Sequence, residues 1–284
     1  MLLSKSTSGL LAGTGFLSGR GFLRSNVLFD PDALAYITAI EGDGVTVTGA
    51  QKTALSDFVV AQKASGAWAV LSRMYHPTWG VAAANARCLV SATSGTFNGS
   101  VTHGTGYIAR ADSTGYFDTG IQVDEVSGLT NDSAWIGALM KTAVSNDQYL
   151  GAQIYGSLFL LRHTVTTAIT CEILSSSGGR FSTGTPSGNT GIISGRRLSG
   201  TRANNQRLAA GRSVLGSSTD SAVGTALAIN IYALQRNNNG TPSSGNGSHM
   251  GAMWFGSGVS DALDSSFTAD LETLWETVTG LSIP

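Results

Sequence analysis

Between Val81 and Gly258, short segments rich in β-branched, aromatic and aliphatic residues alternate with clusters of Gly, Ser, Asn and Thr. Many short strands separated by turn residues are typical of a β-sandwich or jelly roll. No period of roughly 20–50 residues repeats, which disfavours a propeller or a solenoid. We therefore expect a mainly β fold, with residues 81–259 forming one sandwich. The predicted strands are 87–93, 106–110, 115–123, 133–142, 148–155, 157–163, 167–174, 189–197, 202–208, 225–236 and 248–257.

Two connections between these strands are predicted to be tight hairpin turns. Gly156 and Ser157 lie between two strand-like segments, which is the arrangement of a two-residue β-hairpin loop. The run Asn237-Asn238-Asn239-Gly240 consists of residues that tolerate positive φ angles.

The composition supports a folded, sheet-rich protein. Hydrophobic residues make up 42% of the 284 residues, whereas a disordered chain would be poorer in them and richer in net charge. Charged residues make up only 12%, about half of the usual ~25%, so Ser, Thr, Asn and Gly must supply the surface. No apolar run reaches the ~18–20 residues that a membrane span requires. We also expect no signal peptide, because no positively charged region precedes an apolar segment at the N-terminus.

Residues 30–80, before the sandwich, are predicted to form a small helical unit. Asp30 followed by Pro31 has the pattern of an N-cap and a first helical residue. Gly42 or Gly44 ends this first helix.

A second helix is predicted to begin after Thr48. Gln51 stands three residues later, which completes a capping box, and Gly66 supplies a left-handed stop. We expect this helix to pack beside the sandwich, with Phe58 and Trp68 buried against β-strands.

Residues 1–29 combine large apolar side chains with glycines at short intervals. So many glycines oppose a stable helix, and flexible tails seldom carry so many large apolar groups. A disordered terminus and an extended docking arm both fit this pattern, and the apolar spacing favours the arm. The predicted docking residues, which would contact a partner subunit, are Leu10, Leu11, Phe16, Leu17, Phe22 and Leu23.

Residues 260–284 are predicted to form a closing helix that packs on the sandwich. Its start is ambiguous between Ser260 and Ser265, and Gly280 ends it. Its acidic residues gather in the first turns, where the helix dipole favours them. The apolar stripe consists of Phe267, Leu271, Leu274 and Val278.

The charges are unevenly distributed along the chain. Arginines concentrate between residues 172 and 220, whereas residues 261–284 carry acids and no Lys or Arg. This asymmetry can serve contacts between copies of the protein or with an anionic partner, or can be an ordinary solvated surface. The arginines are sparse and lack interleaved aromatic residues, which argues against nucleic acid. The candidate contact residues are Arg196, Arg197, Arg202 and Arg207.

The sequence contains no pattern of a catalytic site. Glycoside hydrolysis requires two carboxyl groups on one face. Glu41 and Asp43 lie in a glycine-rich turn, and Asp124 and Glu125 would point to opposite faces of a strand. Glu172 has no acidic neighbour. We therefore expect a protein that is not an enzyme.

Metal and cofactor sites are not expected either. The four histidines have no spacing typical of a metal site and are predicted to be hydrogen-bonded surface or turn residues. Asp112, Asp118 and Asp124 could ligate Ca²⁺, but aspartates in turns usually bond their own backbone. Cys88 and Cys171 match no zinc or redox motif, and two isolated cysteines are more often buried and reduced than paired.

Four separated segments resemble, in the same order, a module of tailed-phage virion proteins. The first is the capped helix that leads into KASGAW and then SRMYHP, over residues 48–77. The second, residues 104–120, contains GTGY and GYFDTG, and the third is RNNNGTP at 236–242. The fourth is MWFGSGVS at 253–260. The region 175–215 has no counterpart in this resemblance.

The resemblance implies a concanavalin A-like jelly roll in a fibre, spike, baseplate or head-decoration protein. Its implied location is the virion, and its implied partners are other virion proteins and other copies of itself, with a trimer as the first expectation. Loops that face outward could contact a host-surface glycan. Two alternatives remain: a lectin-like adhesion module, and a glycoside hydrolase on the same fold. The resemblance transfers no catalytic residue.

Overall fold

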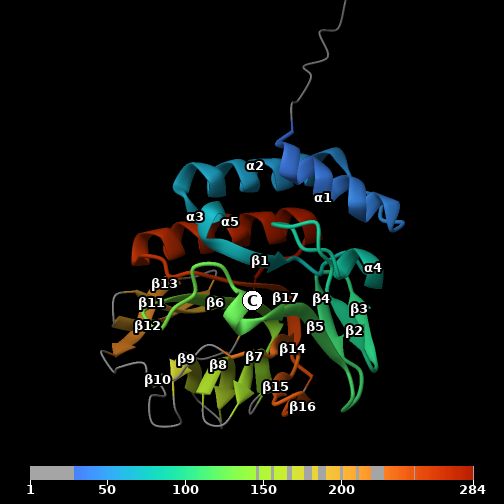
Figure 1. The fold of residues 1–284 in the computed structure, drawn as a ribbon. Coiled ribbons are helices and arrows are strands. Elements are labelled where there is room, and N and C mark those ends of the chain that lie inside the picture. Colours follow the sequence, from blue (N-terminus) through green and yellow to red (C-terminus); the bar gives the residue numbers. More distant parts are fainter. Residues whose placement is uncertain are drawn as a thin grey trace, which may run out of the picture.

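The computed structural model describes residues 29–144, 147–154, 157–164, 168–175, 181–184, 190–198, 201–208, 211–218, 227–245 and 247–283. Over these residues, two β-sheets pack face to face and a layer of helices covers one of them (Figure 1). This confirms the predicted mainly β sandwich with an N-terminal helical unit and a C-terminal helix. Residues 1–28, which carry all six predicted docking positions, lie outside the described residues.

The sheet next to the helices, called the near sheet, has the order β13-β12-β11-β6-β17-β4-β3, and β1 pairs with β17 beside this path. β6 and β17 lie at its centre and pair antiparallel, with Trp254 opposite Gly137. Its strands are β1 (Leu71–Tyr75), β3 (Val101–Gly104), β4 (Tyr107–Arg110), β6 (Ser133–Thr142), β11 (Gly191–Leu198), β12 (Thr201–Leu208), β13 (Gly211–Ser218) and β17 (His249–Gly256).

The opposite sheet, called the far sheet, has the order β10-β9-β8-β7-β14-β5-β2, and the short hairpin β15–β16 pairs with β7. Its strands are β2 (Thr96–Asn98), β5 (Tyr116–Gln122), β7 (Asp147–Ile154), β8 (Ser157–Thr164), β9 (Ala168–Ser175), β10 (Phe181–Gly184), β14 (Asn230–Ala233), β15 (Arg236–Asn238) and β16 (Thr241–Ser243). The predicted turn at 237–240 is confirmed, since Asn239 and Gly240 have φ angles of 52° and 87°. The turn predicted at Gly156-Ser157 is only partly described, because Gly156 lies outside the described residues.

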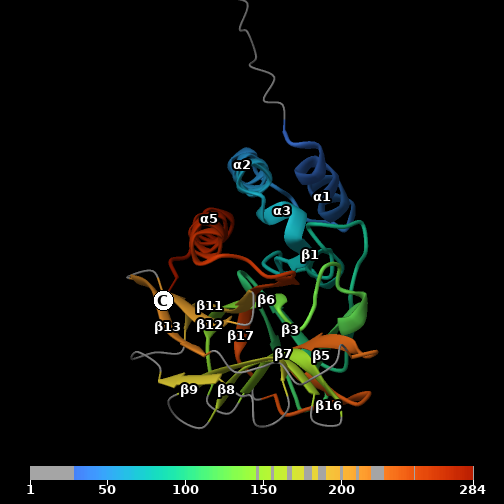
Figure 2. The same cartoon turned by 60° about the vertical axis from the view of Figure 1, so that its left-hand side comes forward.

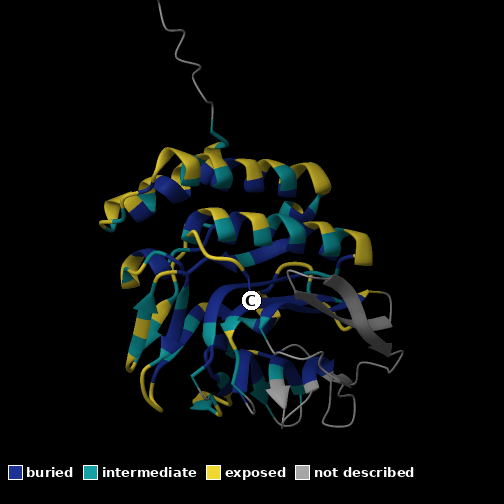
Figure 3. Ribbon diagram, turned by 180° about the vertical axis from the view of Figure 1, so that it is seen from behind, coloured by how far each residue is buried: buried dark blue, intermediate teal, exposed yellow. Residues whose placement is uncertain are grey.

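The central strands of the near sheet are buried on both faces, because helices cover one face and the far sheet covers the other (Figure 3). Along β6, Ile136 and Met140 point into the core between the sheets. Trp135 and Leu139 point into a second core beneath the helices. This double burial explains why β6 reads as a nearly continuous apolar run rather than as an alternating one.

The helical layer consists of α1 (Pro31–Gly42), α2 (Gly49–Ser65), the short α3 (Ala67–Val70) and α4 (Ala82–Asn85), and α5 (Asp261–Thr279). The caps are those that the sequence predicts. Thr48 and Gln51 form the capping box of α2, and Gly66 ends α2 with a φ angle of 87°. Ser260 is the N-cap of α5, and its hydroxyl accepts from the Leu263 amide, while Gly280 ends this helix in the left-handed region.

α2 packs mainly on α5 rather than on strands (Figure 2). Phe58 is buried, as expected, but its ring contacts Phe267 of α5 with 5.8 Å between centroids. Trp68 is only half-buried and lies beneath the ammonium group of Lys63. The expectation that both aromatic rings are buried against β-strands is therefore wrong. At Phe58, α5 lies between α2 and the near sheet, whereas Trp68 belongs to the short α3 and its ring is only partly covered.

Several strand boundaries differ from the prediction. Residues 71–75, expected within the helical unit of 30–80, form β1 and pair with β17. Residues 87–93 form no strand but only isolated bridges, such as that of Cys88 with Tyr75. Within the predicted strand 225–236, the structure describes only Asn230–Ala233 and Arg236, the first residue of β15, as strand. The short strands β2, β3, β10 and β16, together with β13, were not predicted.

A buried charge network joins the closing helix to the near sheet. Asp264 of α5 is fully buried and accepts hydrogen bonds from Trp135 Nε1 at 3.1 Å and Ser194 Oγ at 2.8 Å. Arg196 Nη1 of β11 donates to the same carboxylate at 3.1 Å, and its guanidinium also pairs with Asp261. Part of the charge asymmetry along the sequence is therefore used within the chain.

Removing the positive partner of this network should destabilise the fold strongly. In Arg196→Met, the Asp264 carboxylate stays buried without its countercharge, and breaking a buried pair in this way costs about 3–5 kcal/mol. We expect a loss of that size in the free energy of unfolding, measured by urea denaturation at pH 7. The control is Asp261→Asn, at a carboxylate that is 71% exposed, for which we expect less than about 1 kcal/mol. Equal effects of the two variants would contradict this assignment.

Candidate functional site

The structure places two of the four predicted contact arginines inside the protein. Arg196 and Arg197 are 3% and 1% exposed. Arg196 binds Asp261 and Asp264, and Arg197 Nε lies 3.5 Å from an Asp132 carboxylate oxygen. The expectation that these two contact an anionic partner or another subunit is corrected, because acids of the same chain bind them. The side chains of Arg202 and Arg207 lie outside the described residues.

The carboxylates considered for catalysis are largely held in ion pairs. Glu41 pairs with Lys52 at 2.7 Å, and Asp43 receives two hydrogen bonds from Arg87 at 2.7 and 2.8 Å. The Arg87 guanidinium accordingly holds the pKa of Asp43 below its usual value.

Glu172 is fully buried and accepts from Arg162 Nη2 at 3.0 Å. Glu41, Asp43 and Glu172 line neither of the two grooves described below.

Two of the three aspartates considered for Ca²⁺, Asp112 and Asp118, bond their own turns or a neighbouring strand. Asp112 accepts from the amide and hydroxyl of Thr114 at 2.7 and 2.6 Å, and these bonds lower its pKa. Asp118 accepts from the Gly120 amide at 2.9 Å. Within the described ranges, no group of three His, Cys, Asp or Glu residues could hold a metal ion.

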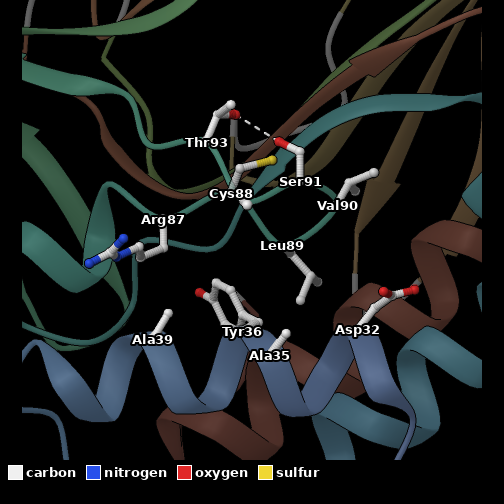
Figure 4. Close-up of a pocket in the computed structure, with 11 residues that line it drawn as sticks. Asp32, Ala35, Tyr36, Ala39, Arg87, Cys88, Leu89, Val90, Ser91 and Thr93 are labelled. Carbon is white, nitrogen blue, oxygen red and sulfur yellow. Dashed lines mark hydrogen bonds between the residues drawn. The ribbon is translucent and has the colours of Figure 1, made fainter.

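A groove of about 370 Å³ lies between α1 and the segment 87–93 (Figure 4). Tyr36 and Leu89 project into it, and Arg87 and Asp32 lie at its opposite ends. Both end charges are already paired, Arg87 with Asp43 and Asp32 with Lys63. The Tyr36 hydroxyl accepts from Trp79 Nε1 at 2.9 Å, and burial raises the pKa of this tyrosine. The groove thus offers a mainly apolar surface and no charge that lacks a partner.

Both cysteines are buried, as the sequence predicts. Cys88 lines the groove of Figure 4, with its sulfur directed toward Ser91. The hydroxyls of Ser91 and Thr93 lie 2.7 Å apart above it.

A second surface gathers polar and aromatic side chains on the outer face of the far sheet. We call Tyr116, Asp118, Asn230 and Tyr232 the polar–aromatic patch. The rings of Tyr116 and Tyr232 lie 4.6 Å apart. Asn230 Nδ2 donates to both carboxylate oxygens of Asp118, at 3.0 and 3.1 Å.

The register of the strands explains this patch. Tyr232 of β14 lies opposite Asp118 of β5. In β5, Phe117 and Thr119 between the patch residues are buried, so Tyr116 and Asp118 share the opposite face. Burial and the nearby Asp118 carboxylate raise the pKa of Tyr232 to about 12.

The patch was only partly visible in the sequence. Six aromatic residues of the sequence could either stack on sugars or fill the core of a sandwich: Trp79, Tyr107, Tyr116, Trp135, Tyr149 and Trp254. Of these, Trp135, Trp254 and Tyr149 are core residues. The alternation Tyr116-Phe117-Asp118 could have indicated the shared face. The pairing with β14 depends on tertiary structure and could not.

The three histidines with described side chains do not form a site, and one of them is deeply buried. His76 is fully buried after β1, its Nδ1 lies 3.1 Å from the Thr78 hydroxyl, and its Nε2 has no hydrogen-bond partner among the described residues. It is therefore not a surface residue. His103 lies 3.1 Å from Asn85 Nδ2. His249 stacks on Tyr107, and the side chain of His163 lies outside the described residues.

No known protein family matches the chain. A search of curated proteins likewise finds no significant relative. Solved structures do resemble it. Trypanosoma rangeli sialidase in complex with 2,3-difluorosialic acid is 9% identical with a TM-score of 0.50, over 78% of this chain and 40% of that one. The receptor binding domain of botulinum neurotoxin C/D mosaic serotype is 7% identical with a TM-score of 0.49, over 74% of this chain and 51% of that one.

The chain therefore spans about two-fifths of the sialidase and half of the toxin domain. At such low identity the likeness shows the fold alone, which is a two-sheet sandwich of the concanavalin A-like type. No described helix is long and apolar enough to cross a membrane.

The buried imidazole of His76 should make stability depend on pH. Burial lowers its pKa to about 3, against about 6.5 in the unfolded chain. Because the folded protein binds this proton less readily, the stabilisation is complete above pH 6.5 and declines as the pH falls toward 3. Between pH 7 and 4.5 we expect the wild type to lose about 2–3 kcal/mol more unfolding free energy than His76→Gln. The measurement is the free energy of unfolding in urea as a function of pH. The same pH dependence in the wild type and in His76→Gln would contradict this prediction.

Proposed function

We propose that this chain is a structural component of a tailed-phage virion, which attaches through residues 1–28 and exposes the sandwich. The observation that supports this is the packing of the first and fourth resembling segments against each other. β1 of the first segment pairs with β17 of the fourth, with Met74 opposite Trp254. α2 of the first segment packs on α5, which directly follows the fourth. The start and end of the resemblance thus form one structural unit.

The point at which the N-terminal arm joins the fold is fixed. The Asp30 carboxylate accepts from Lys63 Nζ at 2.7 and 2.8 Å, and the Asp30 amide donates to Ser56 Oγ at 2.8 Å. This junction lies on the helical layer, and the near sheet separates that layer from the far sheet (Figure 2). Attachment through the arm would therefore leave the far sheet turned away from the particle.

Particle association tests this proposal. We expect the chain in mass spectra of purified particles of the phage whose genome encodes it. A variant without residues 1–28 should fold, because α1 begins after them with its own cap, but should be lost from particles. The control is Tyr116→Ala, which should be incorporated like the wild type. Absence of the full chain from every particle fraction, or normal incorporation of the truncated chain, would overturn the proposal.

A lectin-like adhesion module is the second candidate, and the polar–aromatic patch favours it. The half-buried Tyr116 ring, which lies against the buried ring of Tyr232, offers an apolar face for a sugar ring, while Asp118 and Asn230 offer hydrogen bonds. The patch lies on the far sheet, which is the side that the virion proposal leaves accessible. The ligand class would be a neutral host-surface glycan.

Loss of one stacking ring should weaken such binding. For Tyr116→Ala we expect affinity for host-surface polysaccharide to fall about tenfold, as for loss of an aromatic contact worth ~1–1.5 kcal/mol. Tyr107→Ala removes a half-buried tyrosine of the near sheet, against His249, and should bind as the wild type does. The measurement is retention on immobilised polysaccharide. Equal retention of the two variants, or no retention of the wild type, would exclude glycan binding at this patch.

A further inference from the structure

A second groove, of about 550 Å³, runs along the outer junction of α2 and α5. We call it the α2/α5 groove. Phe58 and Leu274 form its floor. Its walls consist of small side chains, which leave space that larger residues would fill: Ala50, Thr53, Ala54 and Ala61 of α2, and Thr273 and Thr277 of α5.

Hydrogen bonds fix the width of this groove toward both of its ends. Gln51 Nε2 donates to the Val278 carbonyl at 2.7 Å, near the start of α2 and the end of α5. Gln62 Nε2 donates to Asp270 Oδ2 at 2.8 Å, near the end of α2. The groove is therefore formed before any partner arrives, which lowers the entropic cost of binding.

The charges beside the groove are acidic. Both lysines of α2 lie on the side of the helix that faces α1. Lys52 pairs there with Glu41 of α1, and Lys63 pairs with Asp30, the N-cap of α1. The groove side carries Asp57 from α2 and Asp270 from α5, and α5 contains no Lys or Arg. A partner for this surface should combine apolar and positively charged side chains.

We infer that the α2/α5 groove binds the segment Arg20-Gly21-Phe22-Leu23-Arg24 from the N-terminal arm of a second copy of this chain. Residues 1–28 carry Lys5, Arg20 and Arg24 and no acid. In an extended segment, residues 20, 22 and 24 face the same side, so Phe22 would meet Phe58 and Leu274 while the two arginines reach Asp57 and Asp270. Five extended residues span about 16 Å, which matches the ~16 Å of helix between Ala50 and Ala61.

Geometry favours a second copy over the chain's own arm. Asp30 is anchored to α2 on the flank that faces α1. Residues 25–29 span at most about 18 Å, and a helix with its side chains is about 10–12 Å across. The chain's own segment would have to run almost straight over the exposed ridge of α2, including Val60. A neighbouring copy has no such constraint, and head-to-tail exchange of arms around a closed ring gives a trimer or another cyclic oligomer.

This inference rests on the docking arm of the proposed function, but it is tested without particles. The molar mass of the purified full chain is measured by light scattering after size exclusion. We expect an oligomer, and a monomer after deletion of residues 1–28. Asp57→Arg should weaken association about tenfold or more, because attraction becomes repulsion. Asp57 is exposed, so this variant should keep the wild-type unfolding temperature.

Exchanging the charges of Asp57 and one arginine of the arm identifies which arginine pairs with Asp57. Combining Asp57→Arg with either Arg20→Glu or Arg24→Glu should restore the oligomer in one of the two pairings. Asp124→Arg, the same charge change at an exposed position after β5, should leave association unchanged. A monomeric full chain, an Asp57→Arg variant that still associates fully, or failure of both pairings would overturn the inference. Association in solution without particle incorporation would instead overturn only the proposed virion function.

Discussion

The buried carboxylate of Asp264 is the constraint on which the layered arrangement depends. One side chain on α5 accepts from Trp135 of β6 and from Ser194 and Arg196 of β11. A buried carboxylate is tolerated only when such partners compensate its lost hydration. Only one rotation and one position of α5 on the near sheet satisfy all three donors. The same placement brings Phe267 against Trp135 and Trp254, at 4.6 and 5.1 Å between centroids, so polar and apolar packing select the same geometry.

Local signals in the sequence predicted most of the framework. The capping box at Thr48, the left-handed stops at Gly66 and Gly280, and the turn before Gly240 each depend on a few neighbouring residues. The long central strand β6 was also predicted with its observed bounds. β1 was missed because its apolar residues fit a helical face as well as a strand, and only pairing with β17 decides between them. The short strands β2, β3 and β16 contain too few residues for any periodicity.

The candidate site residues were harder to predict, because their roles depend on contacts between distant segments. The arginines near residue 196 and the acids after residue 260 were recognised as an asymmetry, but the sequence could not distinguish contacts within the chain from contacts between chains. Arg196 and Asp264 are 68 residues apart, and only the packing of α5 on β11 brings them together. The polar–aromatic patch is similar, since Asp118 and Asn230 meet through strand pairing across 112 residues.

The two outer surfaces of the protein have different physical characters, and this separates the proposed roles. The α2/α5 groove is apolar, flanked by acids, and lies on the layer from which the arm departs. The polar–aromatic patch lies on the far sheet, with the sandwich core and the near sheet in between. A protein that assembled through the helical layer would keep the patch accessible, whereas assembly through the far sheet would cover it. Attachment through the helical layer and recognition through the patch therefore do not compete for one surface. No described contact joins the α2/α5 groove directly to the polar–aromatic patch, so a substitution in either surface should leave the other intact.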